Sequence, residues 1–223
     1  MSTIVEPPRH SPAEVPAAEP VVALHRRTID TVLIAFGAVI TVVLLVAGGL
    51  LTWGHNFSND YVSKELSSQH VSFPDAAALK AEGRDDLQKW AGRSVSTGDE
   101  AQAYASYING HLAKIGGGAT FADLGAPETA AKAAVTAAKA ANQPQAAIDT
   151  LQADATKITG QRDSLFKGET LRGLLLSAYA WSVVGTIAGI AAIAAFIAAG
   201  IMLVLVGLGL VHHRRATKAT ATT

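Results

Sequence analysis

The chain contains two long apolar stretches separated by a mixed polar segment. The second stretch, residues 173–211, has 39 residues without a charged side chain, Pro, Asn, Gln or His. As one α-helix it would rise about 58 Å, whereas the hydrocarbon core of a bilayer is only about 30 Å thick. The pattern therefore predicts a long helix whose C-terminal part crosses a membrane, together with a similar length of apolar helix that something other than lipid covers.

The first apolar stretch, Thr31–Trp53, has 23 residues and can cross a bilayer with some tilt. A cleaved signal peptide is the alternative, but its apolar part is usually only about 7–15 residues long. No convincing small-x-small cleavage site precedes Trp53, which favours an uncleaved transmembrane helix over residues 29–53. We expect the Trp53 indole at the membrane interface, where such rings are enriched.

Basic residues lie at the outer ends of both stretches, before the first and after the second. The bilayer portion of the second stretch is placed near Thr186–Val211. Because Lys and Arg accumulate on the cytoplasmic side, both clusters are predicted to anchor the spans there. The sequence thus predicts a multi-pass plasma-membrane protein with both termini in the cytoplasm and residues 54–172 outside it. The predicted anchoring arginines are Arg26, Arg27, Arg214 and Arg215.

Residues 54–172 carry the start and stop signals of short helices instead of alternating strands. Thr97 followed by Glu100 is a capping box, which predicts the start of a helix. The triplet Gly116–Gly118 predicts the end of that helix. Gly160 is expected to bend or break the last short helix before Asp163 leads into the long apolar one. Short helices are predicted over residues 76–81, 84–91, 98–115, 127–141 and 148–158.

The apolar faces of these short helices are narrow and made largely of Ala. Alanine buries little surface, so an independent core within residues 54–172 would be marginal. We therefore predict an all-α fold in which two transmembrane helices flank an extracytoplasmic helical domain. That domain is expected to pack against the upper half of the long helix, around Leu174–Val184, and against another protein.

Small residues recur at three- and four-residue spacing in the second apolar stretch. Small side chains let helix backbones approach closely in lipid. Gly and Ala are also common in membrane spans, so both interpretations stay open. If the stripe packs, it packs against the first span or against a partner. The candidate helix-packing residues are Gly185, Ala188, Gly189, Ala192, Ala195 and Ala199.

Both ends of the chain are predicted to be polar cytoplasmic tails. Residues 1–28 include five prolines within the first twenty positions and few bulky apolar residues. Such a segment cannot bury enough surface to offset its ordering entropy, so we expect disorder. Residues 212–223 form a short basic tail.

Candidate chemistry is scarce along the whole sequence. The chain has no Cys, and its 18 basic and 18 acidic residues balance, which argues against thiolate metal sites and against a nucleic-acid partner. His55, His70 and His111 lack the spacing of zinc helices. The apolar stretches carry no ionisable side chain of the kind that proton relays or haem ligation require. We expect no catalytic, cofactor-binding or metal-binding residue and no small-molecule substrate.

Two segments resemble a known group of proteins. AQAYASYINGHLAKIGGGATFADL (Ala101–Leu124) and GETLRGLLLSAYAWSVVGTIAGIAA (Gly168–Ala192) are similar to small actinobacterial two-span membrane proteins with an external helical loop. The chain also resembles an accessory factor of the mycobacterial respiratory supercomplex, which joins cytochrome bcc to an aa-type cytochrome oxidase. The resemblance implies a non-catalytic subunit of this electron-transport complex that aids its assembly or stability.

Other roles stay open on the sequence alone. One is a scaffold or partner of an envelope lipid transporter, and another is a membrane-anchored extracytoplasmic sensor that signals through the Pro-rich tail. An enzyme is the least favoured role. It would be indicated by a substrate-dependent activity that is lost on changing His55, His70 or His111.

Overall fold

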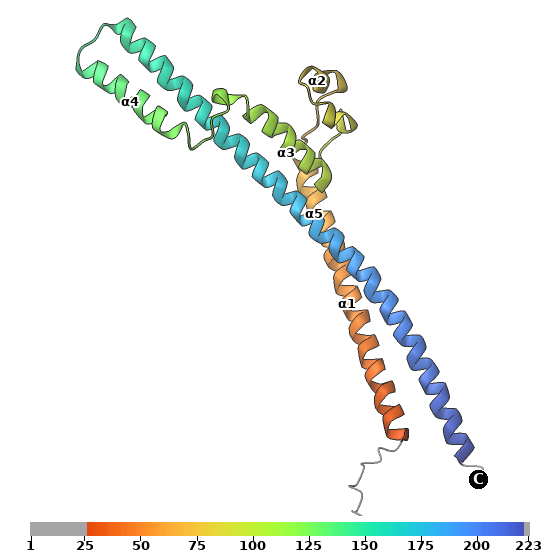
Figure 1. Ribbon diagram of the computed structural model, residues 1–223. Helices are drawn as coiled ribbons and strands as arrows, with labels where there is room; N and C mark the ends of the chain where they lie inside the picture. Colours follow the sequence, from red (N-terminus) through yellow and green to blue (C-terminus); the bar gives the residue numbers. More distant parts are fainter. Residues whose placement is uncertain (1–25, 221–223) are drawn as a thin grey trace, which may run out of the picture. The chain divides into compact units, whose positions relative to one another are not determined.

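The computed structural model describes residues 26–220 and the side chains of residues 28–215. Most of the predicted N-terminal tail and the last residues of the C-terminal one lie outside this range. Within it every regular element is a helix, and a single isolated bridge joins Ser72 and Ser94 (Figure 1). The all-α prediction is therefore confirmed. The helices are α1 (Arg26–Ser68), α2 (Ala76–Ala81), η1 (Asp85–Trp90), α3 (Gly98–Leu112), η2 (Ile115–Gly117), α4 (Gly125–Ala140) and α5 (Gln145–Thr220).

The chain divides into two compact units, and α1 and α5 contribute to both. Unit 1 contains the chain up to Val42 and from Gly200 onward, and unit 2 contains Val43–Ala199. Both α1 and α5 are long and apolar enough to cross a membrane. α1 does not end with its apolar stretch at Trp53 but continues as one helix to Ser68.

The expected break at Gly160 is wrong, because α5 passes through this position without interruption. A glycine inside a helix costs only about 1 kcal/mol relative to alanine. Tertiary contacts offset that cost here, since Thr159 and Arg162 on either side of Gly160 are bonded to Glu128 of α4. The long helix therefore begins at Gln145, well before the apolar run.

Helices α2 and α3 begin where their local signals place them, whereas α4 begins at Gly125, two residues before the predicted start, and α3 ends at Leu112, three residues before the predicted end. The Asp75 carboxylate accepts a hydrogen bond from the Ala78 N–H at 2.8 Å and caps α2. The capping box of Thr97 and Glu100 is present at the start of α3. The predicted helix over residues 84–91 is a 3-10 helix, η1, instead of an α-helix.

Buried Glu100 carries more bonds than its capping role requires. Its carboxylate accepts the N–H and hydroxyl of Ser96 and the N–H of Thr97, and it pairs with Arg93 at 2.7 Å. Burial opposes ionisation of this group, but the hydrogen bonds and the Arg93 charge outweigh it, so the pKa of Glu100 lies below its ordinary value. The carboxylate fixes the loop that leads into α3.

Helix α3 packs against α5 through two small apolar clusters in unit 2. Leu175 of α5 lies in the first cluster and Leu165 in the second. The packing expected around Leu174–Val184 is thus found near Leu175, at the start of that range. It continues toward the N-terminus of α5, as far as Leu165. The first cluster consists of Phe73, Val95, Ala101, Ala105 and Leu175, and the second of Leu112, Leu124 and Leu165.

Candidate functional site

The predicted small-residue stripe on α5 meets α1 in unit 2. Partner residue numbers rise along α1 as they fall along α5, so the two helices are antiparallel. A side chain at any of the three contact glycines would collide with the opposite helix. A Cβ would lie 2.9 Å from the Phe196 ring at Gly48, 2.9 Å from Ser58 Cβ at Gly185 and 2.8 Å from His55 Nδ1 at Gly189.

The close approach allows two side chains of α1 to bond main-chain carbonyls of α5. The Ser58 hydroxyl donates to the Trp181 carbonyl at 2.6 Å, and His55 Nδ1 donates to the Gly185 carbonyl at 2.7 Å. Each acceptor lies four residues before a glycine, because Gly185 follows Trp181 and Gly189 follows Gly185 by one turn. The glycines therefore leave uncovered the carbonyls of the preceding turn, which a side chain would otherwise screen.

The His55 imidazole is engaged at both nitrogens. A carbonyl oxygen only accepts, so Nδ1 carries the hydrogen that points at Gly185. The Asn59 side-chain nitrogen lies 3.3 Å from both ring nitrogens, and Nε2 is the one left with a lone pair to accept its hydrogen. With both ring nitrogens bonded, this histidine joins helices and does not offer a free ligand or base.

The residues of this contact repeat every seven positions on both helices. A seven-residue repeat keeps one seam of each helix against the other and is the spacing of left-handed helix pairs. Within unit 2, positions spaced seven residues apart and buried or half-buried include Gly48, His55 and Val62 on α1 and Ala178, Gly185, Ala192 and Ala199 on α5.

All six candidate helix-packing residues are less exposed than their large neighbours. Gly185, Ala192 and Ala199 are buried, and Ala188, Gly189 and Ala195 are half-buried. The α1 half of the contact was not predicted from the sequence. The seven-residue spacing of Gly48 and His55 is a signal that could have found it.

Of the predicted anchoring residues, the structure describes the side chains of Trp53, Arg214 and Arg215. The Trp53 side chain is 67% exposed, and Arg214 and Arg215 are exposed at the C-terminal end of α5. Arg26 and Arg27 belong to α1, but their side chains lie outside the described part of the structure.

Unit 1 contains the same kind of contact between α1 and α5. A Cβ at Gly37 would lie 2.9 Å from Val206, and one at Gly209 would lie 3.1 Å from Ile34. The Thr41 hydroxyl is buried here and donates to the Gly37 carbonyl at 2.8 Å. Gly37 of α1 therefore leaves room for Val206 of α5. About one turn along, Gly209 of α5 leaves room for Ile34 of α1.

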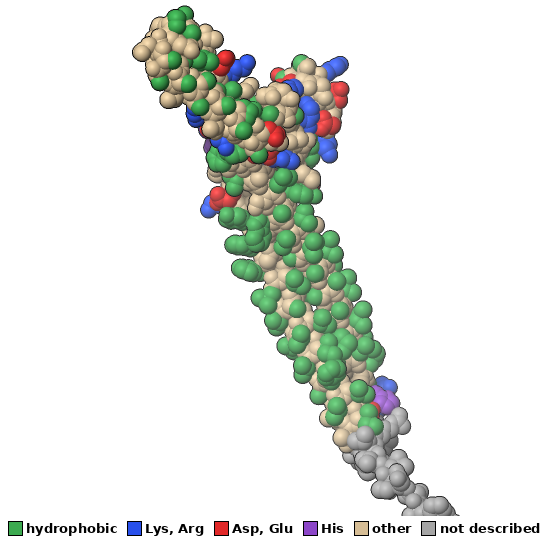
Figure 2. Space-filling model, turned by 60° about the vertical axis from the view of Figure 1, so that its left-hand side comes forward, with side chains coloured by type: hydrophobic (Ala, Val, Ile, Leu, Met, Phe, Trp, Pro, Cys, Tyr) green, Lys and Arg blue, Asp and Glu red, His purple; other side chains and the backbone are tan. Residues whose placement is uncertain are grey.

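An exposed row of aromatic rings follows one face of α1 in unit 2. Trp53, Phe57 and Tyr61 stack in sequence, with centroids 5.5 Å and 6.1 Å apart. Figure 2 shows hydrophobic side chains along the long helices, whereas charged groups gather over the short helices. This aromatic row extends the apolar surface of α1 beyond Trp53, where the uncharged stretch ends.

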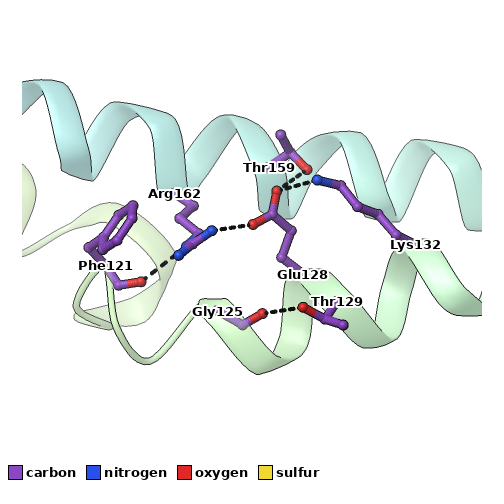
Figure 3. Close-up of polar contacts among 7 residues, drawn as sticks. All are labelled: Phe121, Gly125, Glu128, Thr129, Lys132, Thr159 and Arg162. Atoms are coloured by element: carbon purple, nitrogen blue, oxygen red, sulfur yellow. Dashed lines mark hydrogen bonds and ion pairs between the residues drawn. The ribbon is translucent and has the colours of Figure 1, made fainter.

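A polar cluster around Glu128 joins α4 to α5 (Figure 3). The Glu128 carboxylate accepts Lys132 Nζ at 2.6 Å, Arg162 Nη1 at 2.7 Å and the Thr159 hydroxyl at 2.9 Å. Arg162 also lies 4.0 Å over the Phe121 ring. Hydrogen bonds from Lys132, Arg162 and Thr159 lower the pKa of Glu128 to about 2. A carboxylate held ionised by three donors is suited to fixing two helices and not to proton transfer.

Of the other two histidines between the apolar stretches, His111 makes a local contact. His111 Nε2 lies 3.1 Å from the Glu82 carboxylate, and the Tyr107 hydroxyl donates to the same group. His70 stands in the loop after α1 with a left-handed backbone. Over the described residues, no group of three or more His, Asp or Glu side chains is placed to hold a metal ion.

Comparison of the chain with protein-family models, curated protein sequences and solved structures finds no match. Function is therefore argued from the residues and the geometry above.

Replacing Gly185 with Leu is expected to separate α1 from α5 in unit 2. The new side chain would overlap Ser58 and displace its bond to the Trp181 carbonyl, with a cost of about 1–3 kcal/mol. The chain has no cysteines, so spin labels at Asp60→Cys and Thr186→Cys report one distance, which should lengthen and broaden. Gly54→Leu is the matched control, because a Cβ there meets nothing within 4 Å. An unchanged distance in the Gly185 variant would contradict the close contact of α1 with α5 at this position.

Acid should loosen the α4–α5 hairpin through Glu128. Its pKa is lowered from 4.5 to about 2, so the ionised carboxylate contributes fully above pH 4.5. That contribution is lost as the pH falls from 4.5 toward 2. Glu128→Gln should weaken docking at neutral pH and flatten this pH dependence, as followed by the methyl resonances of buried Val135. The control is Asp163→Asn, which removes an exposed pair with Lys167. An equal response from both variants would refute the assignment.

Proposed function

We propose that this chain is a non-catalytic accessory subunit of a membrane complex. In this proposal α1 and α5 cross the plasma membrane, both termini are cytoplasmic, and the helices between them lie outside. The subunit aids assembly or stability by presenting a preformed helical surface to larger subunits.

The observation that carries the proposal is the length of exposed apolar surface on α5. Large apolar side chains are exposed on successive turns from Leu171 to Val211, which corresponds to about 60 Å of helix rise. A bilayer core covers about 30 Å. Exposed apolar surface beyond that length marks contact with another protein. On α1 the exposed apolar positions likewise run from Ile29 to Tyr61.

The state of the polar groups supports a structural role. Glu100 and Glu128 are the buried carboxylates of the described chain, and hydrogen bonds from neighbouring helices and loops saturate both. His55 is bonded at both ring nitrogens. Groups that transfer protons or bind ligands need a free lone pair or an open position, and these residues offer none.

The resemblance of Ala101–Leu124 and Gly168–Ala192 supports a specific partner. It favours the actinobacterial respiratory supercomplex, in which cytochrome bcc and cytochrome oxidase carry the electrons. The chain itself has no Cys, and its apolar stretches contain no Asp, Glu, Lys, Arg or His, so its proposed contribution is to hold such subunits and not to conduct electrons.

Purification of the native protein in mild detergent tests this function. We expect it to elute with large membrane subunits that show haem absorbance, identified by mass spectrometry. Elution as a small free species would overturn the proposal. Co-elution with a transporter and no haem protein would instead indicate the lipid-transport scaffold, and a response abolished by deleting residues 1–20 would indicate the sensor.

The orientation is testable because the chain has no native Cys. A single Cys at the exposed position Ala153 of α5 should react with a membrane-impermeant maleimide in intact cells. A single Cys at Ser11 should react only after the cells are permeabilised. The opposite pattern, or equal labelling of both, would overturn the proposed topology.

A further inference from the structure

A groove of about 420 Å³ lies between the C-terminal part of α1 and α5 in unit 2. Its size is that of a site for a few large side chains. Most of its wall is apolar, and two half-exposed aromatic rings stand in that wall. The principal lining residues are Tyr61, Leu66, Val71, Val95, Leu174 and Trp181.

The aromatic row on α1 leads into this groove. Tyr61 is both the last ring of the row and a lining residue. From Trp53, where the apolar stretch ends, to Tyr61 the helix rises about 12 Å. The headgroup region on one side of a bilayer is only about 5–8 Å deep. A bilayer whose boundary lies at Trp53 therefore stops short of the groove, so lipid is not the occupant that its position favours.

One charged group lines the groove, and its sign indicates the chemistry of the occupant. Glu65 is exposed at the rim and forms no ion pair with any side chain that the structure describes. The rings of Tyr61 and Trp181 line the same groove, each 53% exposed. A carboxylate in the same groove as aromatic rings favours a Lys or Arg side chain. Such a cation can pair with the carboxylate and lie over a ring face.

We propose that the groove receives side chains from one face of a helix of a second, different membrane protein. That helix leaves the bilayer beside the aromatic row of α1, places an apolar face against Leu174 and Trp181, and presents Lys or Arg to Glu65. Large aromatic side chains in apolar pockets supply most of the energy of such contacts. The inference rests on the proposed accessory role and identifies the surface and the partner chemistry through which it acts.

Site-specific photocrosslinking in native membranes tests the occupant. The full chain carries p-benzoylphenylalanine in place of Trp181, and the matched control carries it in place of Phe166, an exposed α5 aromatic outside the groove. We expect the Trp181 position to crosslink to a peptide adjoining a transmembrane helix of a different protein. An adduct with lipid, with a second copy of this chain or with a soluble protein would overturn the inference, as would no adduct.

The charge of Glu65 provides a second test in the same crosslinking chain. Glu65→Lys should lower the crosslink yield about tenfold and Glu65→Gln about threefold, as expected for repulsion and for loss of an exposed ion pair. Asp60→Lys is the control, because it makes the same charge change one turn away and outside the groove. Equal effects of the two Lys variants would remove the cationic partner from the proposal.

Loss of this inference and loss of the proposed function give different results. A chain that co-purifies with a membrane complex but gives no crosslink from position 181 retains the accessory role and loses the groove. A chain that purifies as a free species loses both. The label distance between positions 60 and 186, measured in Glu65→Lys, shows whether that variant keeps the α1–α5 contact, and Glu65→Gln serves where it does not.

Discussion

The contact of Ser58 and His55 with main-chain carbonyls of α5 is the constraint on which unit 2 depends. It exists because Gly185 and Gly189 have no side chains to hold α1 away. On α5 the residues that face α1 are mostly Gly and Ala, so the two backbones approach closely. The hydrogen bonds to the Trp181 and Gly185 carbonyls fix how α1 is aligned along α5. That alignment in turn sets which residues of α1 and α5 line the groove beside Trp181.

A small buried apolar surface also characterises the packing of the short helices α3 and α4 against α5. Only two small clusters fix α3, and α4 has little more than Val135 and Ala138 to bury. Burial of apolar surface stabilises a fold by about 25 cal/mol per Å², and an Ala-rich face buries little area. Glu128 therefore matters out of proportion to its size, because its bonds to Thr159 and Arg162 join α4 to α5 where apolar packing is thin.

Much of the secondary structure could be predicted because its causes are local. The Asp75 and Thr97 side chains accept hydrogen bonds from main-chain N–H groups three residues later, so each cap is set by neighbouring residues. The glycine triplet was less decisive, because α3 ends at Leu112 before it and Gly116 and Gly117 lie in η2. Gly160 failed as a predicted break because the bonds that hold α5 straight come from α4, far away in sequence. The small residues of the α5 stripe made it a candidate packing surface and left open whether it packs at all, and its contact with α1 could not be chosen without the fold.

The spacing of Gly185 and Gly189 also limits how α1 and α5 can move. If α1 slid along α5 by one turn, Ser58 could reach Gly189, but His55 would then meet Ile193, so one of the two carbonyl bonds would be lost. Sliding in the other direction would bring Ser58 against the side chain of Trp181. Axial displacement of one helix past the other, the piston movement of many membrane receptors, is thus opposed by steric stops at both ends of the stroke.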